Sequence, residues 1–391
     1  MRPELVAPVP ELLTGGQAVA EAMRQIDPDV VPVYPITPQT PIIQGYAAFV
    51  AQGRVHGELI DVESEHSAMS AAVGSALAGA RTITATSSQG LALMAEIVYI
   101  AAAMRAPIVM ALGNRALSGP INIHCDHSDS MLIRDSGVIQ LFAENAQEAY
   151  DLMVMAPRLA EHPDVMLPVL VCQDGFTITH SAEPVELLPD KTVRAFVGEY
   201  VLPNPLLDLA RPTTQGPFAM PDSYYELRHQ QVAALWAALD VFPQLAEEFA
   251  AISGRRYAAL EPYALDDAER AIVCLGSTGG TVKDVVDELR AEGERVGLLQ
   301  VRSFRPFPRE QVRAALVHVC GVSVLDRADS PGSWPPLYAE VAASLYGTDV
   351  YLRSHVCGLG GRDLHPERIR EVFSPEGAPS YLDLRGAPCR V

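Results

Sequence analysis

The amino-acid sequence predicts an α/β protein with two sheet-containing units joined by a long connecting segment. The chain has 391 residues, more than one hydrophobic core normally needs. Short apolar runs rich in β-branched residues alternate with helix-like stretches over residues 15–175, and the alternation resumes at Asp267. Because the predicted strands are almost continuously apolar, we expect parallel sheets covered by helices on both faces.

In the first unit, six apolar runs are predicted to be strands, and they begin at Val30, Gly57, Thr82, Pro107, Val138 and Leu167. The helix-like stretches between or beside them read GQAVAEAMRQI, TPIIQGYAAFVAQ, EHSAMSAAVGSALAGA, QGLALMAEIVYIAAAMR and AQEAYDLMVMAPRLAEH. Two of these stretches carry helix-start signals, a proline after Thr40 and an N-cap residue at Asn145.

The second unit repeats this alternation over a shorter length. Its segments read AIVCLGS, TVKDVVDELRAEG, RVGLLQV, PREQVRAALVHV, GVSVLDR, PPLYAEVAASLYG and DVYLRSHV, and the pattern ends near Phe373. Between the units lies a proline-rich crossover segment, in which only Tyr224 to Ala251 is predicted to be helical and which we expect to lie over a surface. We therefore place the units at residues 1–180, 181–262 and 263–391.

Composition excludes several classes of function. Twenty-nine basic against 48 acidic residues give a net charge of −19, which argues against non-specific nucleic-acid binding. The cysteines lie far apart, without the clustered spacing of an iron–sulfur or zinc site, and we expect reduced thiols. They are Cys125, Cys172, Cys274, Cys320, Cys357 and Cys389.

Nothing in the sequence indicates a membrane or secreted protein. The N-terminal residues MRPELVAPVPELL lack the basic start and apolar run of a signal peptide. The longest apolar stretch, Leu91 to Leu112, is interrupted by Glu96 and Arg105. We expect a cytoplasmic protein.

Two candidate site segments follow predicted strands of the first unit. Tyr34-Pro35-Ile36-Thr37-Pro38 would present the Thr37 hydroxyl rigidly where open parallel sheets bind ligands, although a proline-shaped turn explains the same residues. Glu65 opens a helix of very small residues that allows close packing on a neighbour. A glutamate in a first helical turn also has a purely structural explanation, the helix macrodipole.

Two further segments follow the strand that begins at Pro107. Arg115 could hold a carboxylate through two hydrogen bonds, or form an ordinary loop salt bridge. His124-Cys125-Asp126-His127-Ser128-Asp129 invites a metal interpretation, but helix caps use the same residues and no second cluster supplies further ligands. We predict no metal site.

Two other motifs are weak. The run from Gly276 to Gly280 follows a strand and precedes a helix, but it matches neither the dinucleotide fingerprint nor the P-loop. Asp174-Gly175 with Asn204 faintly resembles the Gly-Asp-Gly…Asn signature that holds magnesium and diphosphate in thiamine enzymes, but Gln173 replaces the leading glycine.

Taken together, several longer motifs resemble the α subunits of the pyruvate:ferredoxin oxidoreductases, the thiamine-dependent 2-oxoacid:acceptor oxidoreductases in their multi-subunit form. In the first unit these motifs are YPITPQTP, ESEHSAMSAAVGSALAGA, TATSSQGLALMAE, GNRALSGPINIHCDHSDSM and RDSGVIQLFAENAQEAYDL. The resemblance continues through EPVELL, FVGEY, LGSTGGT, VRSFRPFP, VLDR and CGLGGRD, and so covers nearly the whole chain.

The resemblance implies a pyrimidine-binding domain of the thiamine-enzyme type, followed by a smaller domain like the transketolase C-terminal domain. Glu65 matches the carboxylate that hydrogen-bonds N1′ of thiamine diphosphate. Thr37 and Arg115 match positions that contact the 2-oxoacid, with Arg115 pairing with its carboxylate. The remaining implied cofactor contacts are Tyr34, Pro35 and Ile36.

The resemblance also implies partners. A β subunit would bind the diphosphate, Mg²⁺ and an iron–sulfur cluster, and γ and ferredoxin-like δ subunits would complete the electron path. The implied reaction is the reversible, coenzyme A-dependent oxidative decarboxylation of pyruvate to acetyl-CoA and CO₂, with electrons passing to ferredoxin. Two alternatives stay open, the same chemistry on another 2-oxoacid (oxalate, an aryl glyoxylate or a branched-chain acid) and a non-catalytic assembly subunit.

Overall fold

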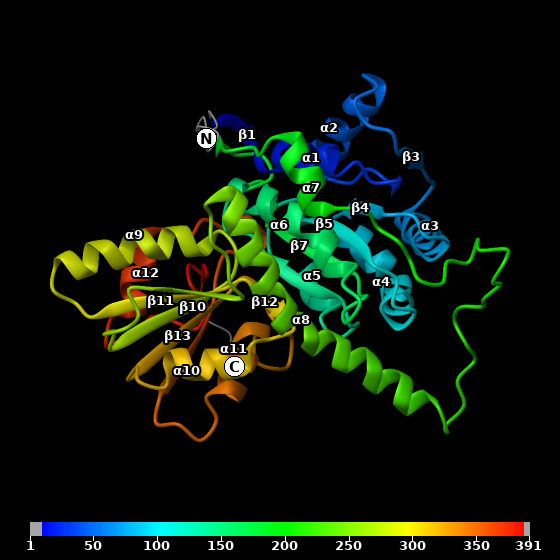
Figure 1. The fold of residues 1–391 in the computed structure, drawn as a ribbon. Helices are drawn as coiled ribbons and strands as arrows, with labels where there is room; N and C mark the ends of the chain where they lie inside the picture. The colour runs from blue at the N-terminus through cyan, green and yellow to red at the C-terminus, as the bar shows by residue number, and fades with distance from the viewer. Residues whose placement is uncertain (1–9, 387–391) are drawn as a thin grey trace, which may run out of the picture.

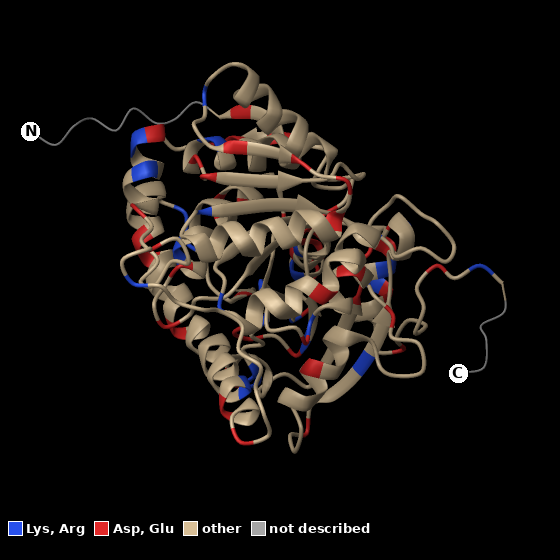
Figure 2. Ribbon diagram, turned by 90° about the vertical axis from the view of Figure 1, so that its right-hand side faces the viewer, with Lys and Arg blue, Asp and Glu red and all other residues tan. Residues whose placement is uncertain are grey.

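The computed structural model describes residues 10–386, and it confirms the predicted α/β class (Figure 1). The predicted lack of a signal peptide concerns residues that lie largely outside this range. Cys389 also lies outside it. Among the described residues, no helix combines the length and the apolar character needed to cross a lipid bilayer. Acidic and basic residues are interspersed along the helices and loops of both halves (Figure 2).

The first half of the chain alternates strands and helices at the predicted places. Its elements are β1 (Glu11–Thr14), α1 (Gly15–Ile26), β2 (Val30–Val33), α2 (Thr40–Ala51), β3 (Glu58–Asp61), α3 (Glu65–Ala78), β4 (Thr82–Thr86), α4 (Ser88–Ala103), β5 (Ile108–Asn114), α5 (Ser128–Leu132), β6 (Ile139–Phe142), α6 (Ala146–Ala160) and β7 (Val169–Asp174). Both predicted helix starts are confirmed: α2 has Pro41 in its first turn, and the Asn145 side chain accepts a hydrogen bond from the Glu148 N–H at 2.9 Å.

Strands β2 to β7 and a strand from the second half, β12 (Ser303–Arg305), form a seven-stranded sheet in the order β12-β6-β7-β5-β4-β2-β3, parallel except for β12. Alternate residues of the central strand β5 face two different cores. Val109 and Ala111 pack with α1, α2 and α6, whereas Ile108, Met110 and Leu112 pack with α3 and α4. This double coverage explains why the strand is apolar at nearly every position.

The second half builds a five-stranded sheet in the order β14-β13-β10-β11-β9, of which only β9 is antiparallel. The elements are β9 (Leu260–Tyr263), β10 (Arg270–Cys274), α9 (Thr278–Ala291), β11 (Val296–Val301), β12 (Ser303–Arg305), α10 (Arg309–Leu316), β13 (Gly321–Asp326), α11 (Pro336–Ser344), β14 (Tyr351–Val356), a 3₁₀ turn (Leu359–Gly361) and α12 (Pro366–Phe373). The chain therefore returns to the first sheet once, when β12 pairs antiparallel with β6.

The crossover segment contains more structure than predicted. Besides α8 (Tyr224–Ser253) it holds β8 (Ala182–Val185), which pairs with β1, and α7 (Asp190–Val197). The prediction of a single helix is therefore wrong, because α7 buries Val193 and Val197 against the first core within only eight residues. Residues 198–223 form neither helix nor strand and reach outward from the body (Figure 1).

The crossover segment touches the body at the far ends of α3 and α4. The Leu206 N–H donates to the Leu77 carbonyl at 2.8 Å, and Gly216 lies beside Met104. The unit boundaries at residues 180 and 262 stay a prediction.

Candidate functional site

The three residues predicted to be catalytic follow strands that end at one edge of the first sheet. Thr37 follows β2, Glu65 follows β3 and Arg115 follows β5, and these strands run parallel in the order β5-β4-β2-β3. The carboxyl edge of such a sheet is where open α/β folds bind ligands. Thr37, Glu65 and Arg115, although far apart in the sequence, therefore lie along the same edge of the first sheet.

Arg115 and Thr37 are in direct contact. The Arg115 guanidinium donates from Nη1 to the Thr37 carbonyl at 2.9 Å, and this bond links the end of β5 to the turn after β2. The Thr37 side chain is exposed, so its hydroxyl is accessible from solvent. The predicted pair is thus assembled through the Thr37 backbone, which leaves the hydroxyl available to a ligand.

The Arg115 side chain is buried without an acidic partner. Only 7% of Arg115 is exposed, and among residues 10–386 it forms no ion pair, while its Nε has no hydrogen-bond partner. The alternative of an ordinary loop salt bridge is therefore not found in the described part of the chain. A buried guanidinium without a countercharge is costly, and an anionic ligand would supply the missing charge.

Asp129 fixes the backbone on which Arg115 stands. Its fully buried carboxylate accepts hydrogen bonds from the Arg115 and Ser88 backbone N–H groups at 2.9 Å each, and from the Asn114 side chain at 2.9 Å. Burial raises the pKa of Asp129 to about 6, and these hydrogen bonds counteract part of that effect. Sequence reasoning treated Asp129 only as a possible cap or metal ligand, because it could not foresee that three segments meet at this carboxylate.

Glu65 stands in the first turn of α3, capped by Ser64, whose side chain accepts the Ser67 N–H at 3.3 Å. Its side chain is 7% exposed, and no hydrogen bond to its carboxylate is found within residues 10–386. The macrodipole remains a sufficient reason for a glutamate here, but it does not require the carboxylate to be buried.

The Thr86 hydroxyl, which has unused hydrogen-bonding capacity, lies beside the Glu65 carboxylate where both pack against Gly90. A β-carbon at Gly90 would lie 2.8 Å from Glu65 Oε1 and 2.4 Å from Thr86 Oγ1, so only a residue without a side chain lets α4 pack this closely against the two groups. Within the described chain, Thr86 Oγ1 and Ser87 Oγ are buried without a hydrogen-bond partner. Such orphaned groups fit a polar ligand edge beside the start of α4.

The predicted cofactor contacts Tyr34, Pro35 and Ile36 form the surface of the turn after β2. Two of their carbonyls are held by side chains, Tyr34 by Gln39 Nε2 at 3.3 Å and Ile36 by Thr40 Oγ1 at 3.3 Å. The turn is therefore stabilised from within, and its outer face is accessible. Contact of these three residues with a cofactor stays a prediction.

The His124–Asp129 segment does not converge on one point. His124 bonds Asn122, Asp126 accepts the Ser128 N–H at 3.0 Å, and His127 turns inward to Asp174 at 2.7 Å. Cys125, His127 and Asp174 do offer atoms within 4.8 Å of one another. The positive charge beside Asp174 is already supplied by the Arg327 guanidinium, whose Nη1 lies 2.7 Å from the carboxylate.

Asp174 joins the two motifs that the sequence left weak. Its carboxylate accepts hydrogen bonds from the Ser277 N–H at 3.1 Å and from the Ser277 hydroxyl at 2.5 Å. Although burial alone would raise the pKa of Asp174, the charges of Arg327 and His127 outweigh it and hold the pKa well below its ordinary value. The glycine-rich start of α9 and the end of β7 are thus linked by a buried charged cluster around Asp174, between the two sheets.

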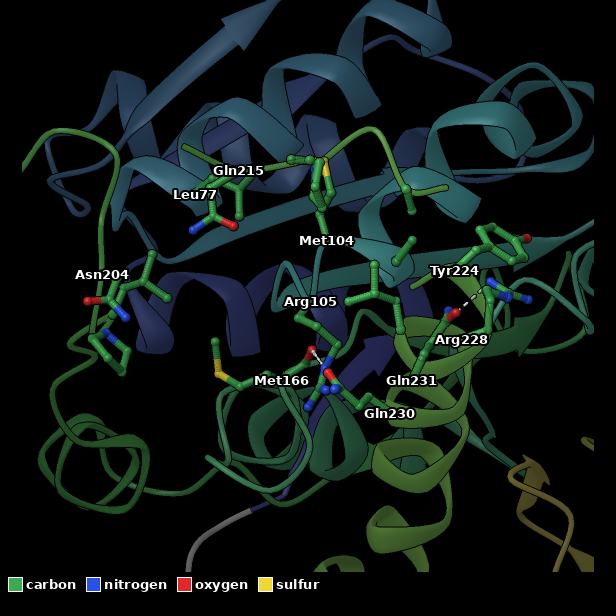
Figure 3. A pocket seen from close by; sticks show the side chains of 17 residues that line it. Leu77, Met104, Arg105, Met166, Asn204, Gln215, Tyr224, Arg228, Gln230 and Gln231 are labelled. Atoms are coloured by element: carbon green, nitrogen blue, oxygen red, sulfur yellow. Dashed lines mark hydrogen bonds between the residues drawn. The ribbon is translucent and has the colours of Figure 1, made fainter. Parts of the chain in front are cut away.

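The cavity in Figure 3 lies elsewhere. It encloses about 490 Å³ and is lined by Leu77, Met104, the crossover segment and the first turns of α8, from which Arg228 and Gln231 project (Figure 3). Because Leu77 lies near the end of α3 and Glu65 at its start, about 20 Å of helix separates this cavity from Glu65. It is therefore distinct from the carboxyl-edge site.

The fold and the site define a doubly wound α/β protein with a polar site at the carboxyl edge of its first sheet and a smaller α/β unit behind it. The chain belongs to the pyruvate flavodoxin/ferredoxin oxidoreductase family. The thiamine diphosphate-binding profile of that family matches residues 21–247, and the profile of pyruvate:ferredoxin oxidoreductase core domain II matches residues 268–369.

Individual relatives agree with this assignment. The pyruvate synthase subunit PorA of Thermotoga maritima is 58% identical over 363 residues, which cover 92% of this chain and 93% of the relative. The subunit of the same name from Methanocaldococcus jannaschii is 47% identical, with 93% and 94% covered.

A solved structure supports the fold. A 2-oxoglutarate:ferredoxin oxidoreductase from Magnetococcus marinus, with 2-oxoglutarate, coenzyme A and succinyl-CoA bound, superposes with a TM-score of 0.73 at 20% identity. The match covers 94% of this chain and 66% of that one.

Proposed function

We propose that this chain is the α-type subunit of a complex that oxidatively decarboxylates pyruvate to acetyl-CoA and CO₂, with electrons passing to ferredoxin. The reaction depends on thiamine diphosphate and coenzyme A and is reversible. Family membership and the two PorA relatives support the reaction class. The single structural observation that carries the proposal is the buried Arg115, whose charge has no acidic partner within residues 10–386.

In this proposal Arg115 binds the carboxylate of the 2-oxoacid. The bond from Arg115 Nη1 to the Thr37 carbonyl fixes the plane of the guanidinium, so that its remaining N–H groups are oriented before a ligand arrives. The exposed Thr37 hydroxyl would donate to the carboxylate or the keto oxygen of the same ligand. Binding then requires little reorganisation, which favours an oriented substrate.

The residues around Glu65 fit the pyrimidine end of thiamine diphosphate. When bound, this cofactor supplies the nucleophile and the electron sink of the family reaction. Glu65 would hold its proton-bearing ring nitrogen, and the orphaned Thr86 and Ser87 hydroxyls would meet its polar edge, while Gly90 lets Glu65 and Thr86 keep their positions against α4. The Glu65 carboxylate is the one group of this chain that we assign to proton movement.

The rest of the catalytic machinery would come from partners. This sequence has no Gly-Asp-Gly…Asn signature and no cysteine cluster, so we assign the diphosphate, Mg²⁺ and an iron–sulfur cluster to a β subunit. Subunits of the γ and ferredoxin-like δ type would complete the electron path. The chain alone is expected to be inactive.

The test is reconstitution with the subunits that co-purify with the chain, followed by coenzyme A-dependent viologen reduction. Pyruvate, oxalate, an aryl glyoxylate and a branched-chain 2-oxoacid are compared. Highest kcat/KM with pyruvate supports the proposal, and a clear preference for another acid would redirect it to that substrate. Assembly without turnover on any of these acids would instead favour a non-catalytic subunit.

A variant pair tests the role of Glu65. Glu65→Gln should lower turnover at least about 100-fold, because the amide cannot take up the proton. Glu96→Gln is the control, since Glu96 lies exposed on the neighbouring helix α4. Near-normal turnover of an assembled Glu65→Gln complex would remove Glu65 from the chemistry.

A further inference from the structure

The loop that follows Arg115 is held by the second half of the chain. Residues 115–127, the arginine loop, leave β5 and return to α5. Asn122 Nδ2 donates to the Gly360 carbonyl at 2.9 Å, and the Gly361 N–H donates to the Cys125 carbonyl at 2.7 Å. Gly360 and Gly361 belong to the glycine loop, residues 358–361, which follows β14.

These contacts continue to Arg115 itself. Inside the arginine loop, the Asn122 Oδ1 atom accepts the His124 N–H at 2.7 Å, and the His124 carbonyl accepts the Ala116 N–H at 3.0 Å. Ala116 is the residue after Arg115. From Gly360 to Ala116 the connection therefore consists of three hydrogen bonds, and one peptide bond then leads to Arg115.

Only glycines allow the two loops to approach so closely. Gly360 and Gly361 have φ values of 60° and 78°, in the left-handed region that favours glycine. A β-carbon at Gly360 would lie 2.4 Å from Asn122 Nδ2, and one at Gly361 would lie 2.3 Å from the β-carbon of His124. These glycines thus combine a special backbone conformation with direct contact to the arginine loop.

A second anchor lies beside the glycine loop. The His127 N–H donates to the Arg327 carbonyl at 2.7 Å, and both side chains meet at Asp174. The far end of the arginine loop is therefore attached to Arg327, the residue after β13, beside the buried charged cluster at Asp174. Both attachments come from the second half of the chain, to which the proposed reaction assigns no substrate contact.

We propose that the glycine loop, and Gly361 in particular, is a positioning element for Arg115: the second half of the chain sets the geometry of the 2-oxoacid site by fixing the arginine loop. This inference rests on the proposed function, in which Arg115 binds the substrate carboxylate. Cys125 and His127, through which the second half of the chain holds the arginine loop, are buried, and close-packed contacts of this kind transmit a displacement rather than absorbing it. A misplacement of about 1 Å at a substrate-binding group lowers rates by up to about 10²-fold.

The test uses two glycines with the same backbone strain. Gly361→Ala places a methyl group against His124, whereas Gly347→Ala has the same φ of 78° and meets nothing within 4 Å. Both are measured in the assembled complex. The KM for pyruvate should rise about tenfold in Gly361→Ala relative to Gly347→Ala, with a smaller change in kcat.

A second measurement does not depend on turnover. Hydrogen exchange of the Ala116 amide reports its bond to His124, and it should be faster in Gly361→Ala than in Gly347→Ala. If Gly361→Ala does not assemble, Asn122→Ala replaces it, because this change removes the bonds to Gly360 and His124 without adding atoms. Asn204→Ala, at an exposed asparagine, is its control.

The outcomes separate this inference from the proposed function. An unchanged KM in Arg115→Ala would overturn the substrate role of Arg115, and the positioning role would go with it. If Arg115→Ala raises KM while Gly361→Ala and Asn122→Ala match their controls in KM and in exchange, the glycine loop does not position Arg115. A raised KM and faster exchange in either variant support the inference.

Discussion

Gly90 offers a direct test of the space beside Glu65. Gly90 is the third residue of α4, and its missing side chain faces the Glu65 carboxylate and the Thr86 hydroxyl. We predict that Gly90→Ala weakens thiamine diphosphate binding to the assembled complex. Helix α4 itself should tolerate the change, because alanine is the better helix former, so the cost falls on Glu65 and Thr86.

The size of the effect follows from the contact distances. Ordinary van der Waals contact of a β-carbon begins at 3.4 Å, so Glu65 Oε1, at 2.8 Å, must move by 3.4 − 2.8 = 0.6 Å. Thr86 Oγ1, at 2.4 Å, must move by 3.4 − 2.4 = 1.0 Å. A displacement of this size at a group that orients the cofactor corresponds to roughly a tenfold to hundredfold loss of cofactor-dependent activity at a fixed, limiting cofactor concentration.

The assay is a titration of viologen reduction with thiamine diphosphate at saturating pyruvate and coenzyme A. Gly280→Ala is the matched control, because Gly280 is likewise the third residue of its helix, α9, and a β-carbon there meets Glu144 at an ordinary 3.6 Å. Thermal unfolding of both variants separates stability from cofactor affinity.

An unchanged cofactor titration in Gly90→Ala, with unfolding like that of Gly280→Ala, would refute the reasoning. It would mean that cofactor binding does not depend on the position that Gly90 allows the Glu65 carboxylate to adopt. The displaced groups by themselves lower the stability of Gly90→Ala by about 1–3 kcal/mol. A loss of stability combined with an unchanged cofactor titration would therefore show that the contact serves packing rather than binding.

Two further predictions concern stability. Arg302 is almost fully buried and pairs with Glu148 at 2.5 Å and Glu261 at 2.6 Å. Arg302→Ala leaves Glu148 buried and unpaired, and should therefore lower the free energy of unfolding by about 3–5 kcal/mol in denaturant titrations. The control variant Arg309→Ala, at an exposed arginine, should be neutral, and equal unfolding free energies for the two variants would show that the ion pairs of Arg302 are unimportant. Burial raises the pKa of Asp326 from 3.8 to about 7, against the opposing effect of two backbone N–H bonds, so the folded state binds this proton more tightly than the unfolded state. The stabilisation of the folded state by the protonated Asp326 carboxyl is therefore fully present below about pH 4. It is lost as the pH rises to about 7, and the loss in unfolding free energy amounts to up to about 4 kcal/mol. The difference in unfolding free energy between the wild type and Asp326→Asn should change with pH in this sense, and a pH-independent difference would contradict it.

The sequence predicted the elements whose pattern is local. Strand β5 is apolar at nearly every position because both faces are covered, and helices such as α6 carry their own caps, so each was recognisable without knowledge of the fold. The short helix α7 and the strands β8 and β12 were missed. Their residues become helix or strand because a distant surface accepts them, as β6 accepts β12, and no local periodicity reports such a surface.

The site shows the same division. Strand-end positions and motif resemblance identified Thr37, Glu65 and Arg115, and the structure gathers them at one sheet edge. The residues that fix them could not be found this way. Asp129 holds Arg115 through backbone donors from separate segments, and Gly361 touches a loop more than 230 residues earlier, a pairing that only the folded chain reveals.

Strand β12 has a consequence for how the protein is made. Its partner β6 ends at Phe142, whereas β12 begins at Ser303, so the 302 − 142 = 160 residues between them must be synthesised first. At roughly 5–20 residues per second, the nascent chain exposes the unpaired edge of β6 for on the order of ten seconds. A fragment truncated before residue 303 would keep that edge open permanently, which is the kind of surface that recruits other strands and aggregates. Expression of the first half alone should therefore give insoluble material unless residues 303–305 are retained or the edge is blocked.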